Sequence, residues 1–250
     1  MRLATFNVLH GRGTSDGQVD LDRFAAAVRT LDADVLALQE VDRGQPRSGS
    51  ADLTAVAAAA GGYAAARFVP ALQGRPGSWR PATDHMEDGP AYGVALLSRL
   101  PVLSERTIRL PALPVPVPVV FASRPRVRVV RDEPRVAAVA ELGTAGAALT
   151  VVSTHLSFLA GWNLVQLRQL VRALDGAPRL VVAGDLNLAP DPVARVARLR
   201  PLATGATFPA HAPVRQIDHL MGRGALTATC ARVWELPLSD HRALSVELDL

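Results

Sequence analysis

Short apolar runs that change abruptly to polar residues recur along the chain, and such runs predict buried strands. The clearest is residues 180–184, which leads directly into Asp185 and Asn187. Side chains two positions apart in an extended segment point the same way, so a carboxylate and an amide are expected at one side of the strand end. The pair would suit a phosphate site, although a turn that begins with Asp and Asn explains this stretch equally well.

The same patterning predicts a mixture of strands and helices along the rest of the chain. Further strands are expected at residues 3–8, 34–40, 92–98, 136–142, 147–154, 217–221, 226–233 and 244–250. Helices are expected over 21–31 after the cap Asp20, over 51–60 before Gly61-Gly62, from Asn163 to Leu174, and from Asp191-Pro192. Residues 70–91 hold many Gly, Pro and polar residues, which is typical of a surface loop.

The middle of the chain is less regular. The segment from Leu110 to Pro118 is rich in proline, which excludes a central strand because proline has no N–H to donate. Five arginines follow, namely Arg124, Arg126, Arg128, Arg131 and Arg135. We interpret this cluster as a solvated edge hairpin with alternating charge rather than as a nucleic-acid site.

The order of the predicted elements favours one layered α/β domain. No low-complexity linker or change of composition interrupts residues 1–250, so a single domain over that range is expected. Strands outnumber helices and many neighbours look hairpin-connected, which argues against a wholly parallel sheet. Asn7, Glu40, His155 and Asp185 each follow an apolar strand, and two similar halves facing each other would bring all four to one rim.

Composition narrows the class of protein. Arginine supplies all 27 basic residues, which explains a pI near 10.4, but a net charge of +4 is too modest to indicate nucleic-acid binding. The single Cys230 excludes an internal disulfide framework. The N-terminal residues do not resemble a signal peptide, and no apolar run reaches the length of a membrane span. We therefore expect a cytoplasmic monomer without a membrane anchor.

The polar residues at the predicted strand ends carry the chemistry. They are Asn7, Glu40, His155, Asp185, Asn187, Asp218, Asp240 and His241. Singly, each is more often a turn or structural residue. In order, however, the motifs Phe6-Asn7, Leu38-Gln39-Glu40-Val41, Ser153-Thr154-His155-Leu156, Gly184-Asp185-Leu186-Asn187, Ile217-Asp218-His219 and Ser239-Asp240-His241 resemble the endonuclease/exonuclease/phosphatase superfamily. The resemblance spans Leu3 to His241.

This resemblance implies a fold and a metal site. The family fold is a four-layer α/β/β/α sandwich of two mixed sheets flanked by helices. Glu40 would be the main protein ligand of a divalent metal, with Asn7 beside it and Asp240 nearby, directly or through water. Mg²⁺ suits oxygen ligands of this kind, with Mn²⁺ as an alternative.

The resemblance also implies catalytic roles. His241 would contact the phosphate or activate water, and Asp218 would orient its imidazole. Asp185 would exchange a proton with the water or the leaving oxygen, Asn187 would orient that group, and His155 would donate to the non-bridging phosphate oxygens.

Other polar residues have weaker assignments. Tyr92 precedes a strand and is a candidate for lining the substrate cleft, although a packing role at the rim explains it as well. Glu133 and Arg135 are expected either near His155 or in an edge ion pair. The remaining histidines, His10, His85, His211 and His219, are assigned to structural or solvent-facing positions.

These features predict a divalent-metal-dependent phosphoesterase that hydrolyses a phosphodiester or phosphomonoester by attack of an activated water. A DNA endonuclease or exonuclease of the same family is the alternative, and a non-catalytic binding module is the third. A serine hydrolase is disfavoured because Ser239, Asp240 and His241 are adjacent and no Gly-x-Ser-x-Gly motif occurs. A zinc enzyme is disfavoured because paired Cys/His ligands are absent from the sequence. The identity of the phosphate-ester substrate is left open, and nucleic acid stays among the candidates.

Overall fold

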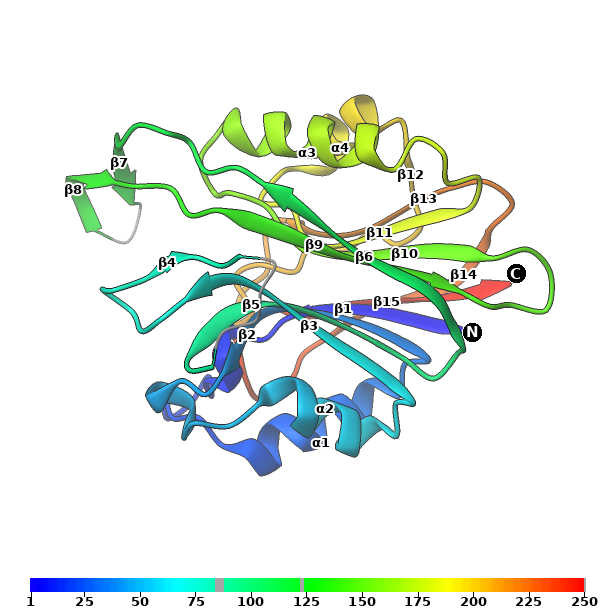
Figure 1. Cartoon of the computed structure of the whole chain (residues 1–250), viewed down its shortest axis with the longest axis horizontal. Helices are drawn as coiled ribbons and strands as arrows, with labels where there is room; N and C mark the ends of the chain where they lie inside the picture. The colour runs from blue at the N-terminus through cyan, green and yellow to red at the C-terminus, as the bar shows by residue number, and fades with distance from the viewer. Residues whose placement is uncertain (84–87, 122–123, 250) are drawn as a thin grey trace.

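The fold is built from two stacked β-sheets with helices on their outer faces (Figure 1). The computed structural model describes residues 1–83, 88–121 and 124–249, without the side chains of 121 and 124–126. Within these residues the layers follow the order helices, sheet, sheet, helices. The four-layer α/β/β/α sandwich of two mixed sheets is therefore confirmed.

The first sheet has seven strands in the described part of the chain. Across the sheet they are β14 (Thr227–Trp234), β15 (Ala243–Asp249), β1 (Arg2–Asn7), β2 (Val35–Arg43), β5 (Ala91–Ser98), β3 (Ala65–Gln73) and β4 (Arg80–Pro81). The second sheet has six: β12 (Arg200–Pro201), β13 (Asp218–Arg223), β11 (Leu180–Asp185), β10 (Leu149–His155), β9 (Arg135–Leu142) and β6 (Val102–Leu110).

Both sheets repeat one pairing pattern. β1 and β2 are parallel neighbours in the first sheet, β10 and β11 are parallel neighbours in the second, and antiparallel strands flank each pair. A helix joins each parallel pair, because parallel strands need a crossover. The carboxyl ends of parallel strands share one edge of a sheet. Asn7 and Gln39 are therefore paired at this edge of the first sheet, and His155 and Asp185 are paired at the corresponding edge of the second sheet.

The helices pack apolar faces onto the outer sides of the sheets. α1 (Leu21–Leu31) and α2 (Leu53–Gly61) cover the first sheet, and α3 (Trp162–Ala173) and α4 (Pro190–Ala197) cover the second; two short 3₁₀ turns are η1 (Leu9–Gly11) and η2 (Pro46–Ser48). The Asp20 carboxylate caps α1 by accepting from two backbone N–H groups. A third apolar layer fills the space between the sheets, including Leu3, Val151, Val181 and Leu244. Full burial of each such side chain contributes about 1.5–3 kcal/mol.

A two-stranded hairpin projects from this body. β7 (Val117–Phe121) pairs with β8 (Arg124–Val130) and with no strand of either sheet among the described residues (Figure 1). Arg128 and Arg131 are exposed, as the edge-hairpin interpretation predicted. The side chains of Arg124 and Arg126 lie outside the described residues. Arg135 departs from the prediction, since it is the first residue of β9 and its side chain is buried.

The structure differs from the sequence-based expectations at three places. The first residues of the loop expected at 70–91 belong instead to β3, which extends to Gln73. This strand pairs with β5 and accommodates Pro70 at a register shift. β6 was not predicted, because much of this edge strand is exposed and lacks a strong apolar pattern. α4 begins at Pro190 after Ala189, one position before the expected cap at Asp191. The last strand was expected to reach Leu250, which lies outside the described residues.

No helix among the described residues combines the length and the apolar character that a bilayer crossing requires.

Gly184 is expected to be intolerant of a side chain. Its φ is 150°, and a Cβ there would lie 1.9 Å from the backbone oxygen of Thr154 on β10. Gly184→Ala should therefore lower the free energy of unfolding by about 3 kcal/mol or more, measured by urea denaturation. Gly176→Ala is the matched control, because a Cβ at that glycine meets nothing within 4 Å. Equal stability of the two variants would contradict the close approach of β10 and β11.

Candidate active site

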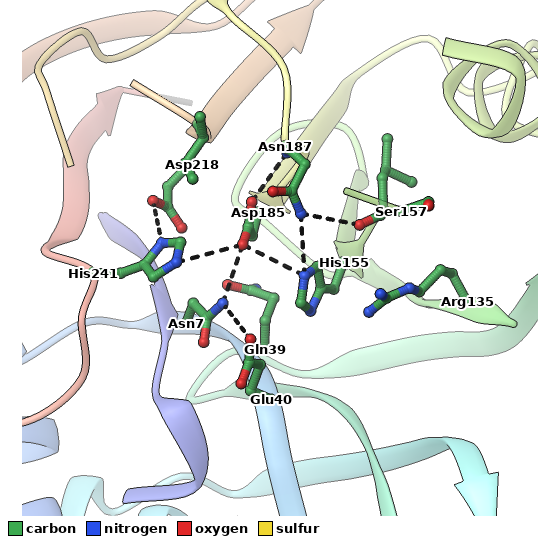
Figure 2. A network of polar contacts seen from close by, with 12 residues as sticks. Asn7, Gln39, Glu40, Arg135, His155, Ser157, Asp185, Asn187, Asp218 and His241 are labelled. Carbon is green, nitrogen blue, oxygen red and sulfur yellow. Dashed lines mark hydrogen bonds and ion pairs between the residues drawn. The ribbon is translucent and has the colours of Figure 1, made fainter. Parts of the chain in front are cut away.

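The strand-end residues of the two sheets meet at one cavity of about 620 Å³ (Figure 2). We call it the strand-end cavity. Its lining includes polar side chains from both sheets and from the loops that adjoin them: Glu40, Tyr92, Glu133, Arg135, His155, Asp185, Asn187, Arg215 and His241. Asn7 and Asp218 are fully buried and bond to members of this set. The fold thus brings together residues that are up to 234 positions apart, from Asn7 to His241.

His241 and Asp218 form a buried dyad. The imidazole Nδ1 of His241 donates to Oδ2 of Asp218 over 2.9 Å, and Thr207 Oγ1 donates to the same oxygen over 2.6 Å. Burial alone would lower the pKa of His241, but the charge and hydrogen bond of Asp218, with the nearby Asp185 and Asp240, outweigh it and raise that pKa to about 10. The imidazole is therefore held as a cation that can bind an anion.

Asp185 occupies the centre of the network. Its Oδ2 accepts from Asn7 Nδ2 over 3.1 Å, and it lies 3.4 Å from His155 Nε2 and 3.7 Å from His241 Nε2. Burial, followed by the negative charge of Asp218, raises the pKa of Asp185 to about 7. A carboxyl group with such a pKa can take up and release a proton near neutral pH.

Asn187 faces the same cavity as Asp185, but for a different reason from the one the sequence suggested. β11 ends at Asp185 and Asn187 has a left-handed backbone with φ 50°, so the segment is not extended. The Asn187 amide nitrogen donates to Leu156 O over 3.1 Å and lies 3.3 Å from His155 Nε2. Leu186 is fully buried between them. A tight turn therefore holds the amide against the β10 strand end.

Glu40 is placed by an irregularity in β2. The strand does not end there as expected but continues to Arg43, and its register with β5 shifts between Leu38 and Val41. Glu40 has φ 56°, which turns its carboxylate to the cavity. Asn7 Nδ2 donates to Glu40 Oε1 over 3.1 Å. Burial, together with the charge of Asp240, raises the pKa of Glu40 despite that hydrogen bond.

The donors around Glu40 fit a hard divalent cation. The residue forms no ion pair within 4.0 Å with a basic side chain in the described part of the chain, so its partly buried charge has only the Asn7 amide and more distant cations to offset it. Asp240 is half exposed beside His241, at 4.0 Å from Nε2. The carboxylate oxygens of Glu40 and Asp240 are of the kind that Mg²⁺ prefers. The Asn7 amide turns its Nδ2 to Glu40 and its Oδ1 to the Leu9 N–H over 3.1 Å.

A second set of atoms is also close enough to hold a metal. Ligand atoms of Asp185, Asp218 and His241 lie within 4.8 Å of one another. We favour Glu40 as the metal ligand, because Asp218 and His241 of the second set already bond to each other. Asp218 does keep one oxygen, Oδ1, without a hydrogen-bond partner among the described residues.

His155 differs electrostatically from His241. Burial, followed by the charges of Arg135 and His241, lowers the pKa of His155 well below its ordinary value. The imidazole is therefore neutral at physiological pH. Its Nε2 lies between the Asp185 carboxylate and the Asn187 amide, where a neutral ring can accept one hydrogen bond or donate one.

Arg135 is a cavity residue that the sequence interpretation left undecided. Its side chain is only 6% exposed, it pairs loosely with Glu133 at 3.6 Å, and its Nε has no hydrogen-bond partner among the described residues. The available signal was its position, directly before the apolar strand 136–142, which matches the placement of the other site residues at strand ends. Its inclusion in an exposed arginine cluster was wrong, because β9 draws it into the interior.

Tyr92 also lines the cavity. Its ring makes an edge contact with Trp79, with 5.4 Å between centroids, and the guanidinium of Arg47 lies over it. Burial and the charge of Glu40 raise its pKa well above the ordinary value. The residue thus combines the packing role at the rim with a place in the cavity wall.

Ser239 is not placed as a nucleophile. Its hydroxyl donates to the backbone oxygen of Asn7 over 2.6 Å and accepts from the backbone N–H of His241. Among the other histidines, His219 is buried with Nε2 bonded to Leu188 O, His211 is exposed, and His10 is partly buried. His85 lies outside the described residues.

Comparison with known proteins agrees with this geometry. Residues 4–241 match the Endonuclease/Exonuclease/phosphatase family. No sequence among curated proteins matches the chain significantly.

Solved structures with the same fold cover the whole chain or nearly so. An endonuclease/exonuclease/phosphatase from Beutenbergia cavernae has TM-score 0.75 at 23% identity, and the match covers 100% of this chain and 71% of that one. A mannosyl-6-phosphatase from Bacteroides thetaiotaomicron has TM-score 0.65 at 13% identity, with 100% of both chains covered. Sphingomyelinase C from Streptomyces griseocarneus has TM-score 0.62 at 18% identity, with 98% of both covered. The convergent strand ends, the fold and the family match lead to one conclusion: this chain belongs to the endonuclease/exonuclease/phosphatase family.

Proposed function

We propose that the protein is a divalent-metal-dependent phosphoesterase that uses an activated water to hydrolyse a phosphodiester or phosphomonoester. One observation carries the proposal. Asp185, whose pKa is raised to about 7, lies between the cationic His241 and the Asn7–Glu40 pair. Membership in a family of hydrolases that act on phosphoester bonds supports the same reaction class.

The acidic residues of the site would bind the metal cation, and the basic residues would bind the phosphate. Asn7, Glu40 and Asp240 would hold the cation, which when bound would supply Lewis-acid stabilisation of the negative charge on the phosphate. The cationic His241 would bind a non-bridging phosphate oxygen, with Asp218 fixing its orientation. Arg135 would offer its unpartnered Nε to the same anion. A phosphate bound between these groups would lie next to Asp185, which is 3.7 Å from His241 Nε2.

Proton transfer would fall to Asp185. As a carboxylate it would accept a proton from the attacking water, and as an acid it would donate one to the leaving oxygen. Asn187 and His155, which lie within 3.3 Å of each other, would orient the reacting oxygen and the phosphate. General acid–base help of this kind typically contributes about 10²–10⁴-fold in rate.

Metal removal is the direct test of cofactor dependence. Hydrolysis of bis(p-nitrophenyl) phosphate and of p-nitrophenyl phosphate should fall to background after dialysis against EDTA. Mg²⁺ or Mn²⁺ should restore it, because oxygen ligands favour these ions. Undiminished activity of metal-free protein, verified by elemental analysis, would contradict the proposal.

Nuclease activity is the alternative within the same chemistry. The observation that favours it is the pair Arg135 and Arg215 in the cavity wall, which suits a polyanion as well as a single phosphate. Abasic and nicked DNA, tested beside the small esters and sphingomyelin with Mg²⁺, would decide between the substrates.

A further inference from the structure

One wall of the strand-end cavity is apolar and also lines a second space. Val119, Val120 and Phe158 line the strand-end cavity together with the catalytic candidates. The same three residues line a neighbouring cavity of about 520 Å³, whose remaining lining is Leu113, Val117, Pro118, Leu159, Ala160 and Trp162. We call this second space the hairpin groove. None of the described residues that line it is charged, so a charged cavity borders an apolar one.

Polar contacts hold the two sides of the hairpin groove in place. At the base of the β7–β8 hairpin, the buried Asp132 accepts from the Leu113 N–H over 2.8 Å and from Ser157 Oγ over 2.6 Å. The Trp162 indole N–H donates to Pro111 O over 3.0 Å. These bonds join the segments on both sides of the hairpin to the loop that follows β10 and carries Phe158. The groove is thus fixed to the same strand that presents His155.

Its apolar surface is exposed to solvent in the structure. Val120 is 61% exposed and Phe158 is 39% exposed, although both border a cavity of charged groups. Exposed apolar side chains gathered next to a polar site are typical of a surface that binds an apolar group. Because Val119, Val120 and Phe158 line both spaces, the apolar groove lies next to the cavity in which we place the phosphate.

We propose that the hairpin groove binds the alkyl chain of an amphiphilic phosphoester whose phosphate lies in the strand-end cavity. This inference rests on the proposed phosphoesterase function and narrows its substrate class. The lining is aliphatic apart from Phe158 and Trp162, which suits a flexible hydrocarbon chain. Each methylene buried there would strengthen binding by up to about fourfold, since its transfer from water contributes about 0.8 kcal/mol.

The experiment compares alkyl p-nitrophenyl phosphodiesters that carry methyl, butyl or octyl groups, all below their critical micelle concentrations, with Mg²⁺ present. We expect kcat/KM to rise about tenfold or more from methyl to octyl. The double variant Val117→Ser, Val120→Ser should lose most of this preference, because two apolar walls of the groove become polar. Val127→Ser is the matched control: it lies on the same hairpin, is 67% exposed and does not line the groove.

Binding gives a second readout that does not need catalysis. Tryptophan fluorescence would follow binding of butyl- and octylphosphonate, and Trp162→Phe would assign the signal to the groove. Octylphosphonate should bind about tenfold or more tightly than butylphosphonate, and the double variant should abolish the difference. Equal binding of both phosphonates, or a chain-length preference that survives in the double variant, would overturn the inference. Hydrolysis of no ester, with chain-length-dependent binding intact, would contradict the phosphoesterase function and leave the groove assignment standing.

Discussion

Glu40→Gln is expected to reduce kcat by about 10³-fold at saturating Mg²⁺ while the protein stays folded. The substitution keeps the size of the side chain and leaves an oxygen to accept from Asn7 Nδ2, but it removes the negative charge that would hold the cation. Loss of a fixed electrostatic group that stabilises the transition state typically costs about 10²–10³-fold, and loss of a metal ligand adds to this. Steady-state kinetics across a Mg²⁺ titration would measure both effects.

A second measurement separates binding from folding. The midpoint of the Mg²⁺ dependence should move to higher concentration in Glu40→Gln, with a melting temperature equal to or above that of the unaltered protein, because burial already disfavours the Glu40 charge. Glu141→Gln is the control, since this residue of β9 is exposed, its carboxylate bonds only to Ser104 among the described residues, and it lies outside the strand-end cavity. Full activity of Glu40→Gln at low Mg²⁺ would remove Glu40 from the site.

Asp185→Asn is expected to lower kcat by about 10²–10⁴-fold, the usual scale for the loss of a general acid or base. Asparagine keeps the size of the side chain and one oxygen, which can still accept from the Asn187 backbone N–H as Oδ1 does, whereas the bond that Oδ2 accepts from Asn7 is lost. The proton-transfer group is lost. Stopped-assay turnover, with metal affinity measured in parallel by calorimetry, should show a large kinetic defect and a small change in affinity. Normal turnover would reduce the 180–187 stretch to an ordinary turn at a strand end.

Asn187→Ala provides a comparison within the same stretch. It should also turn over slowly, because a reacting group loses its orienting amide, but metal affinity should be unchanged. Alanine at φ 50° adds backbone strain, so Asn187→Gly is the matched variant. If the glycine variant regains thermal stability and remains slow, the amide and not the backbone is responsible. Normal turnover in Asn187→Gly would exclude the amide from the reaction.

The sequence by itself determined two things: which strands end in the candidate site residues, and which family the chain resembles. The runs before Asn7, His155 and Asp185 are apolar because both faces of a central strand are buried, and such runs are recognisable without a structure. The order of short motifs along the chain added a resemblance that the match over residues 4–241 confirms. The cap at Asp20 was also predictable from the sequence, whereas the cap expected at Asp191 was wrong.

Tertiary structure decided which of these residues meet and in what electrostatic state. Asp218 is distant in sequence from His241, and only the stacking of β13 against the first sheet brings them to 2.9 Å. The bulge that turns Glu40 inward, and the burial of Arg135, depend on pairing with β5 and β6, which local patterning does not encode. The pKa of Asp185 rises because neighbours from other strands exclude water from it. Strand identity is a local property of the side chains, whereas desolvation and proximity are properties of the packed chain.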